Sequence, residues 1–216
     1  MLSANGLQFN YPRGDFSLRV EKLDVAAGEA LGIMGPSGAG KTTLLRLLSG
    51  ILTPVRGEVS LNNEAVSKLP ENARRCLRLQ RLGLVFQDFA LLDYLSVEDN
   101  LFLPMRLGGL ADEEARDRAL ELIGRLDMTG HWSRLTGELS QGERQRVAVV
   151  RSLLHKPQAV LADEPTSSLD GARKDAVMEL LTTDAKARGA ALIVVTHDAE
   201  MKRWFDRVVD FSDLKS

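Results

Sequence analysis

The chain has 216 residues, of which 44% are hydrophobic and 27% charged, as is ordinary for one compact globular domain. A formal net charge of −2 gives no broad basic field for nucleic-acid binding, although a local basic patch stays open. The single cysteine, Cys76, excludes an internal disulfide and a cysteine-based metal site, and the sequence shows neither a secretory signal pattern nor an apolar run of the roughly 18 residues that span a membrane.

The N-terminal region predicts β-structure of two kinds. Residues 7–11 and 16–25 alternate apolar and polar side chains, which favours an antiparallel β-layer. Residues 30–34, with the sequence ALGIM, form a short apolar run that is typical of a buried strand. A leucine-rich helix is expected to begin near Lys41.

A glycine-rich loop joins that buried strand to the helix. Residues 35–42 match G-x-x-x-x-G-K-[ST] at every position, and the flanking strand and helix disfavour a chance match. Glycines let backbone N–H groups point inward around a phosphate, and the helix start faces the same anion. Lys41 adds charge for the β- and γ-phosphates, and Thr42 offers a hydroxyl to Mg²⁺. The predicted phosphate-binding residues are Gly35, Pro36, Ser37, Gly38, Ala39, Gly40, Lys41, Thr42 and Thr43.

The middle of the chain predicts a helical insert. Residues 57–61 and 82–86 read as two more short strands, after which strand patterns stop from about residue 88 to residue 155. Within this stretch residues 141–154 predict a helix. Residues 111–126 predict another, with an apolar face made of Ala115, Ala119, Leu122, Ile123 and Leu126.

Strand patterns return after the insert, at residues 159–163 and 191–195. Strands separated by helical stretches indicate an α/β domain with a mainly parallel sheet. Asp163 and Glu164 end the first of these runs. Beside a phosphate loop, Asp163 is expected to hold the Mg²⁺ shell and Glu164 to polarise the attacking water, whereas alone they would read as a solvated acidic pair.

Residues 139–170, LSQGERQRVAVVRSLLHKPQAVLADEPTSSLD, resemble the ATP-binding subunits of ABC transporters. LSQGE corresponds to the signature motif of that family, usually LSGGQ, with Gln141 in place of glycine and Glu143 in place of glutamine. Ser140 and Gly142 are retained, and in the family they face the γ-phosphate bound by a second subunit. Ser140 and Glu143 also form an S-x-x-E capping box, and the two interpretations are compatible.

The resemblance implies a P-loop NTPase fold with a RecA-like core, an N-terminal antiparallel β-layer and an inserted helical subdomain. The whole of residues 1–216 would form one ATP-binding domain, with residues 88–155 as the helical signature subdomain. Residues 1–87 and 156–216 would form the catalytic core.

Other family motifs follow in the family's order. Gln87 matches the Q-loop glutamine, which senses Mg²⁺, and His197 matches the switch histidine, which contacts the γ-phosphate. Ser168, Leu169 and Asp170 match the D-loop, which touches the partner subunit. The resemblance therefore implies that Glu164 and His197 are catalytic, and that the metal ligands are Thr42, Gln87 and Asp163.

Three further side chains, one tyrosine and two histidines, lie outside any complete motif. Tyr11 lies upstream of the phosphate loop at about the family's distance and is expected to stack on adenine, with Phe9 and Phe16 as alternatives that could belong to the core. His131 and His155 match no motif and are expected to be surface or packing residues.

Residues 78–109 are similar to one subgroup, which includes ATPases of lipoprotein-releasing systems, macrolide-type efflux pumps and a cell-division system with a four-helix membrane protein. That subgroup works by mechanotransmission, but amino-acid importer ATPases are also similar here. In the family this region lines a groove that receives a short helix of the membrane subunit. The apolar candidates, with plain subdomain core as the alternative, are Phe89, Leu91, Leu92, Tyr94, Leu95, Phe102 and Met105.

The resemblance implies ATP and Mg²⁺ as ligands and a homodimer, or a pair with another ATPase subunit, that closes around two MgATP. It also implies a separate integral membrane permease and a cytoplasmic position on the inner face of the cell membrane. A non-transport ABC ATPase and a small phosphotransferase are the alternatives. The first usually has two cassettes or a long coiled-coil insertion, and the second has no need of residues 139–170.

Overall fold

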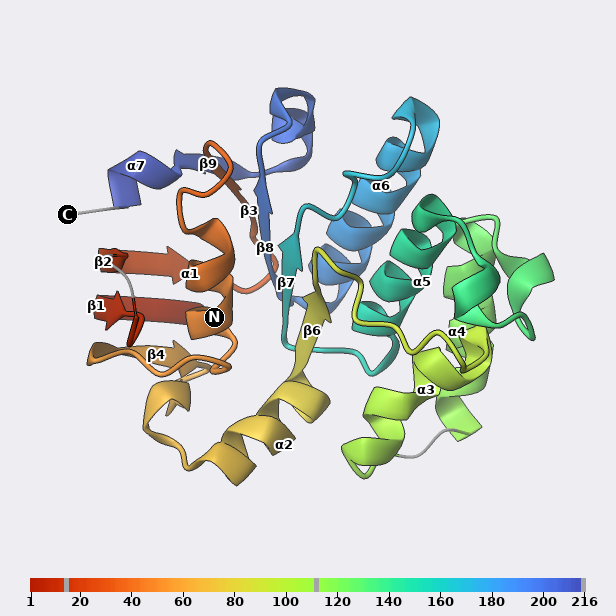
Figure 1. Ribbon diagram of the computed structural model, residues 1–216, viewed down its shortest axis with the longest axis horizontal. Helices are drawn as coiled ribbons and strands as arrows, with labels where there is room; N and C mark the ends of the chain where they lie inside the picture. Colours follow the sequence, from red (N-terminus) through yellow and green to blue (C-terminus); the bar gives the residue numbers. More distant parts are fainter. Residues whose placement is uncertain (14–15, 111–112, 215–216) are drawn as a thin grey trace.

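A computed structural model of the chain describes residues 1–13, 16–110 and 113–214 (Figure 1). One of its two sheets is antiparallel, in the order β2-β1-β4-β5. Its strands are β1 (Leu2–Asn10), β2 (Ser17–Val25), β4 (Arg56–Leu61) and β5 (Glu64–Ala65). The expected antiparallel layer is confirmed, and the strand expected at residues 57–61 belongs to it.

The second sheet is parallel throughout, in the order β6-β7-β8-β3-β9. It consists of β3 (Ala30–Met34), β6 (Leu82–Val85), β7 (Ala159–Asp163), β8 (Ala191–Thr196) and β9 (Arg207–Asp210). The expected parallel sheet is thereby confirmed. The edge strand β9 was not anticipated, because it is mostly exposed and lacks the apolar run of its neighbours.

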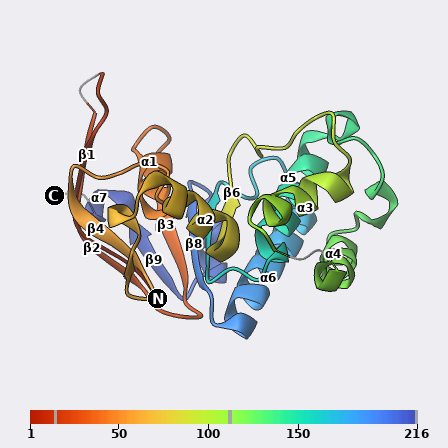
Figure 2. The ribbon, with the colours of Figure 1, turned by 90° about the horizontal axis from the view of Figure 1, so that it is seen from below.

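Alternate side chains of the parallel sheet enter two different cores. Ile193 on β8 joins the core beneath the antiparallel sheet, whereas Leu192 and Val194 join the core on the helical side. Helix α1 (Lys41–Leu48) is packed into the first core through Leu44 and its neighbours, between the two sheets (Figure 2). The start of α1, which follows the phosphate loop, is thus fixed from both sides.

The helical side contains α3 (Val97–Leu107), α4 (Glu113–Arg125), α5 (Gln141–Leu154) and α6 (Gly171–Arg188) (Figure 1). The five residues expected on one apolar face of α4 are all buried, although residues 111–112 lie outside the described part. Between β6 and β7 the described residues contain only an isolated bridge, Ser96 to Leu135, in agreement with the expected helical insert.

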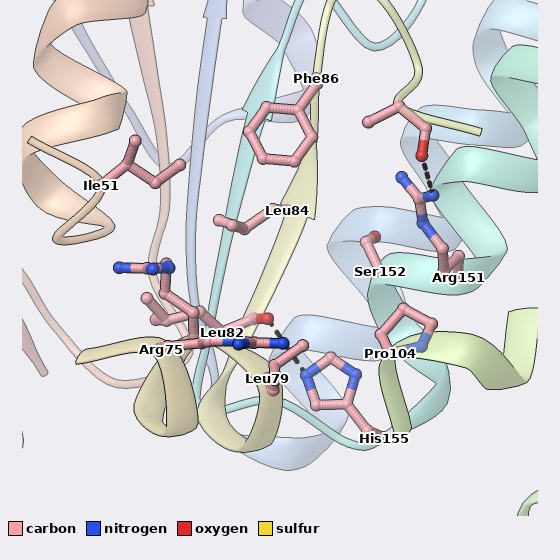
Figure 3. A pocket seen from close by; sticks show the side chains of 12 residues that line it. Ile51, Arg75, Leu79, Leu82, Leu84, Phe86, Pro104, Arg151, Ser152 and His155 are labelled. Atoms are coloured by element: carbon pink, nitrogen blue, oxygen red, sulfur yellow. Dashed lines mark hydrogen bonds between the residues drawn. The ribbon is translucent and has the colours of Figure 1, made fainter. Parts of the chain in front are cut away.

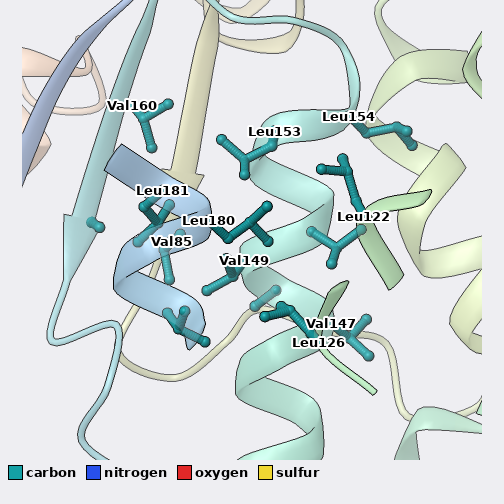
Figure 4. Packing of buried hydrophobic residues seen from close by; sticks show 14 of the residues in the cluster. Val85, Leu122, Leu126, Val147, Val149, Leu153, Leu154, Val160, Leu180 and Leu181 are labelled. Atoms are coloured by element: carbon teal, nitrogen blue, oxygen red, sulfur yellow. The ribbon is translucent and has the colours of Figure 1, made fainter. Parts of the chain in front are cut away.

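One hydrophobic cluster joins these helices to the sheet, with α5 at its centre (Figure 4). Gly83 on β6 lets α5 approach the strand closely, because a Cβ there would lie 2.2 Å from the carbonyl oxygen of Ser152. The division of the chain at residues 87/88 and 155/156 stays a prediction, since α5 shares its core with both parts.

The remaining helices are short or peripheral. They are α2 (Glu71–Arg81), α7 (Phe211–Leu214) and the short 3-10 helices η1 (Val66–Lys68), η2 (Thr129–His131), η3 (Thr136–Glu138) and η4 (Ala199–Trp204). Within the described ranges, no helix combines the length and the apolar character that crossing a bilayer requires.

Candidate functional site

The loop between β3 and α1 requires glycine at two positions. Gly38 and Gly40 have φ angles of 77° and 111°, in the left-handed region that side chains rarely adopt. A Cβ at Gly40 would also lie only 2.7 Å from Cζ of Phe16. The loop therefore keeps its backbone free of side chains where it turns into the helix.

Two side chains at the start of α1 point to opposite parts of the site. Lys41 Nζ donates hydrogen bonds to the carbonyl oxygens of Gly35 at 2.6 Å and Pro36 at 2.9 Å, so the ammonium lies against the loop. Thr42 donates its hydroxyl to Asp163 Oδ2 at 2.6 Å, across from β7. Burial raises the pKa of Asp163, while the bond from Thr42 opposes that shift.

Glu164, directly after β7, has a left-handed backbone with φ of 50°. Its carboxylate oxygen Oε1 accepts hydrogen bonds from the backbone N–H of His197 at 3.0 Å and lies 2.7 Å from Nδ1 of that ring. Oε2 accepts the hydroxyl of Thr196 at 3.0 Å. The carboxylate is therefore held by the end of β8, while the imidazole of His197 is largely exposed.

A cavity of about 430 Å³ brings most of the predicted nucleotide-binding residues together. It lies where β6 and β7 end, as ligand sites in parallel sheets do. Its lining is formed by Tyr11, Phe16, Ser37, Gly38, Gly40, Lys41, Thr42, Thr43, Gln87, Asp163 and Glu164. Gly35 and Pro36 do not line the cavity themselves, but their carbonyl oxygens accept hydrogen bonds from Lys41, which does. In the same way the ring of His197 contacts the lining residue Glu164. Ala39 follows Gly38 in the loop but is not part of the lining.

The aromatic side chains near the cavity divide into core and lining. Phe9 is 7% exposed and belongs to the core. Tyr11 packs edge-on against it, with ring centroids 4.9 Å apart, and its hydroxyl lies 3.1 Å from Oγ1 of Thr43. Tyr11 and Phe16 both line the cavity, so either ring is placed to meet a base.

The donor set suits a hard cation. Thr42 supplies a hydroxyl, Asp163 a carboxylate and Gln87 an amide, all of them lining one cavity. Mg²⁺ prefers such oxygen ligands and usually binds through one or two protein groups, phosphate oxygens and waters. The described residues contain no group of three or more His, Cys, Asp or Glu side chains that could hold a metal alone. This arrangement fits a metal ion whose remaining ligands are phosphate oxygens of a bound nucleotide.

The signature residues lie outside this cavity, at the start of α5. Ser140 is the N-cap of the helix, and the expected capping box with Glu143 is confirmed. Gln141 begins the helix and is exposed. A Cβ on Gly142 would lie 3.0 Å from the carbonyl oxygen of Ser168, so the helix start packs closely on that loop.

Gln145, which no sequence motif indicates, connects α5 to two loops. Its side chain is buried, donates to the carbonyl oxygen of Glu164 at 2.8 Å and accepts the N–H of Ser168 at 2.9 Å. Leu169 is buried beside it, and Asp170 caps α6 by accepting the N–H of Arg173. Only the burial of an amide on an apolar helix face, not visible in sequence, distinguishes Gln145.

A second hollow, of about 250 Å³, lies between α2, β6, α3 and α5 (Figure 3). Its lining is apolar and basic, and no acidic side chain of the described residues contributes to it. The lining residues are Ile51, Arg75, Arg78, Leu79, Leu82, Leu84, Phe86, Ala90, Pro104, Arg151, Ser152 and His155. Burial lowers the pKa of Arg151 to about 10 and that of His155 to about 4.

The apolar residues expected to line a groove are not those that line this hollow. Phe89, Leu91, Phe102 and Met105 are buried in the core, and Leu92 and Tyr94 are exposed elsewhere. The cause is local, because Phe89 and Ala90 have φ angles of 62° and 48° and turn the chain after β6. Arg151 holds this turn by donating to both of their carbonyl oxygens, at 2.6 and 2.5 Å.

Together, the phosphate loop, the acidic strand end and the two sheets define an ATPase cassette of the P-loop class. The ABC transporter family profile matches residues 18–167. The chain therefore belongs to the ABC transporter family, and it is an ATP-binding and hydrolysing subunit. The expected fold class, family and enzymatic activity are thereby confirmed.

Among the relatives is the lipoprotein-releasing system ATP-binding protein LolD of Legionella pneumophila (strain Lens). It is 37% identical over 212 residues, which cover 97% of this chain and 93% of the relative. LolD of Paramagnetospirillum magneticum is 38% identical over 215 residues, covering 98% and 95%.

Solved structures agree with these relatives. The dimeric bacterial ABC transporter cassette MJ0796 has a TM-score of 0.89 and 31% identity, covering 97% of this chain and 94% of that one. A post-hydrolysis dimer of the same cassette, bound to ADP and Pi, also has a TM-score of 0.89, with 32% identity and coverage of 100% and 94%.

Proposed function

We propose that this chain powers a transporter of the lipoprotein-release or efflux type, by transmitting ATP-driven motion to a separate membrane subunit. The observation that carries the ATPase part is the cavity in which Lys41, Thr42, Asp163 and Glu164 converge. The names of the LolD relatives and the resemblance of residues 78–109 support the transporter type.

In the proposed site the phosphate loop holds the triphosphate, and Lys41 exchanges its bonds to the loop carbonyls for phosphate oxygens. Thr42 and Asp163, already joined by a hydrogen bond, would hold Mg²⁺ with the help of Gln87. Bound there, the cation would neutralise charge on the β- and γ-phosphate oxygens. Tyr11 is the proposed partner of the adenine ring.

Glu164 is the proposed residue that orients and polarises the attacking water. Its carboxylate is now bonded to His197 and Thr196, so the active arrangement requires at least one of those bonds to open. His197 is exposed enough to turn toward a γ-phosphate once it is released. The bond from Gln145 to the Glu164 carbonyl keeps the backbone in place during that change.

Two copies are proposed to close head-to-tail, so that Ser140 and Gly142 of one face the γ-phosphate bound by Lys41 of the other. The exposed position of the signature residues, outside the cavity of their own chain, supports this arrangement. The γ-phosphate then stabilises the closed state by contacts that exist only there. Ser168, Leu169 and Asp170 would lie at the same interface.

The hollow between α2 and α5 is the proposed docking site for a helix of the membrane subunit. Its walls are apolar, and of its arginines Arg78 is already paired with Glu71. Arg75 makes no hydrogen bond or ion pair with any described residue, and Arg151 bonds only to backbone oxygens. We therefore expect the docked helix to carry a carboxylate. The subunit is proposed to be of the four-helix type, with this chain bound at the inner face of the cell membrane.

The test is affinity purification of the full chain from detergent-extracted membranes. A co-purifying four-helix protein with a large outer domain would support the proposal. A permease with a solute-binding protein would favour an importer, and ribosomes or DNA would favour a non-transport ATPase. Ile51→Asp should abolish the association by placing a carboxylate on the apolar wall, while Leu120→Asp, on the exposed face of α4, should not.

A further inference from the structure

The start of α5 contains a carboxylate–imidazole pair outside the nucleotide cavity. Glu143 Oε1 lies 3.0 Å from Nε2 of His131, and both side chains are about one fifth exposed. The other oxygen, Oε2, accepts hydrogen bonds from the N–H and the hydroxyl of Ser140, each at 2.8 Å. The signature serine and a histidine from η2 are therefore joined through one carboxylate.

The imidazole of His131 is oriented by Glu143 alone. Its Nδ1 is buried and has no hydrogen-bond partner among the described residues. The signature motif of the family usually has glutamine where this chain has Glu143, and a glutamine would need no counter-charge. The pairing therefore depends on the carboxylate that Glu143 supplies.

Glu143 is an anion in this arrangement. The hydrogen bonds from Ser140 hold the pKa of the Glu143 carboxyl below its usual range. Arg146 on α5 is the other charged group that acts on Glu143. Arg146 in turn is near Asp127 after α4 and near Asp170 and Arg173 at the start of α6. Of these neighbouring groups only the imidazole belongs to a residue type that changes charge near neutral pH.

A carboxylate at this position has a cost if the same helix start must meet a phosphate. Anions are favoured at a helix N-terminus, but a second anion arriving there is repelled by the first. The Ser140 hydroxyl is in addition engaged with Glu143 and not free for a new acceptor. A positive charge on His131 would reduce the repulsion between Glu143 and the phosphate. It would also attract the carboxylate away from Ser140 and so free the hydroxyl.

We propose that His131 is a positioning residue whose positive charge offsets Glu143 and so strengthens ATP-dependent closure of the dimer. The proposal depends on the head-to-tail dimer described under Proposed function. It assigns no contact between His131 and the nucleotide, since His131 acts through Glu143. Closure should accordingly be tighter when residue 131 carries a positive charge than when it is neutral.

The test compares a fixed cation with a neutral donor at the same position. His131→Arg keeps the charge, and His131→Gln keeps an N–H for Glu143 without it. In a Glu164→Gln background that traps the ATP-bound dimer, sedimentation should give about two- to fivefold tighter dimers for the arginine variant, as expected of a partly exposed ion pair. The dimer affinity of the chain with His131 should lie between those of the arginine and glutamine variants.

Glu143→Gln is the matched control, because glutamine preserves the capping box while removing the anion. In that variant the charge of residue 131 should no longer change the dimer affinity. An affinity that ignores the charge at 131 while Glu143 is present would overturn the proposal, and so would a charge effect that survives Glu143→Gln. Absence of any ATP-dependent dimer would overturn the proposed function as well, which separates the two failures.

Thermal unfolding of each variant checks that the substitutions leave the fold intact. His131→Lys is a second cationic variant, in case the arginine does not fit beside η2. The lysine variant must then show the tighter dimer, or the charge argument fails.

Discussion

The nucleotide cavity and the signature end of α5 are built from different kinds of contact. In the cavity, Lys41 and Glu164 are both buried; Lys41 donates to loop carbonyls, and Glu164 is held by the His197 N–H and the Thr196 and His197 side chains. At the signature end, Ser140, Glu143 and His131 hold one another through side chains that are partly exposed. Burial in the fold therefore holds the side chains of the nucleotide cavity in place. The partly exposed side chains at the start of α5 are freer to change partners.

The strongest test of the nucleotide cavity is Glu164→Gln. We expect turnover to fall by at least about 100-fold, because the amide cannot accept a proton from water, while ATP binding persists and dimers accumulate. Steady-state ATPase assays and sedimentation with MgATP measure the two effects. Glu179→Gln, an exposed carboxylate on α6, should be unaffected. Normal turnover in Glu164→Gln would remove this residue from its proposed role.

Lys41→Ala should act on affinity. Loss of a charged hydrogen-bond donor to phosphate is expected to weaken ATP binding by about 10- to 100-fold. Calorimetric titration with ATP measures the change, with the exposed Lys22→Ala as the control. An unchanged dissociation constant would contradict the assignment of the phosphate loop.

Gln145 lies between the two regions, and Gln145→Leu tests whether it connects them. The variant leaves the Glu164 carbonyl and the Ser168 N–H without their partner, which should cost about 1–3 kcal/mol of folding free energy and reduce turnover about tenfold. Ser152→Ala, whose hydroxyl bonds only within α5, is the matched buried control. Equal turnover in both variants would show that Gln145 is merely structural.

The smallest effect is expected at the far end of α5. Burial lowers the pKa of His155 to about 4, below that of a histidine in the unfolded chain, so the unfolded state binds more protons between about pH 4 and 6.5. Stability should therefore fall as the pH falls through this range. In His155→Gln the loss should be smaller by about 1–2 kcal/mol at about pH 4.5, measured by denaturant unfolding, with turnover at neutral pH unchanged.

The sequence predicted the parts of the cavity that depend on local pattern. The loop at residues 35–42 and the strand ending at Asp163 each carry their own signal, and the fold brings them together. The edge strand β9 and the lining of the second hollow were not predictable in this way. Both depend on long-range packing, the first on its pairing with β3 and the second on the turn at Phe89 that Arg151 holds.

The close approach of Gly83 to Ser152 has a mechanical consequence. Because no side chain separates them, the C-terminal end of α5 packs directly against β6, and the helix can pivot at this contact. The signature residues lie at the opposite end, about 16 Å away at the rise of an α-helix. A tilt of about 10° around that point would sweep Ser140 through roughly 3 Å, on the scale of one hydrogen bond, while displacing the sheet hardly at all.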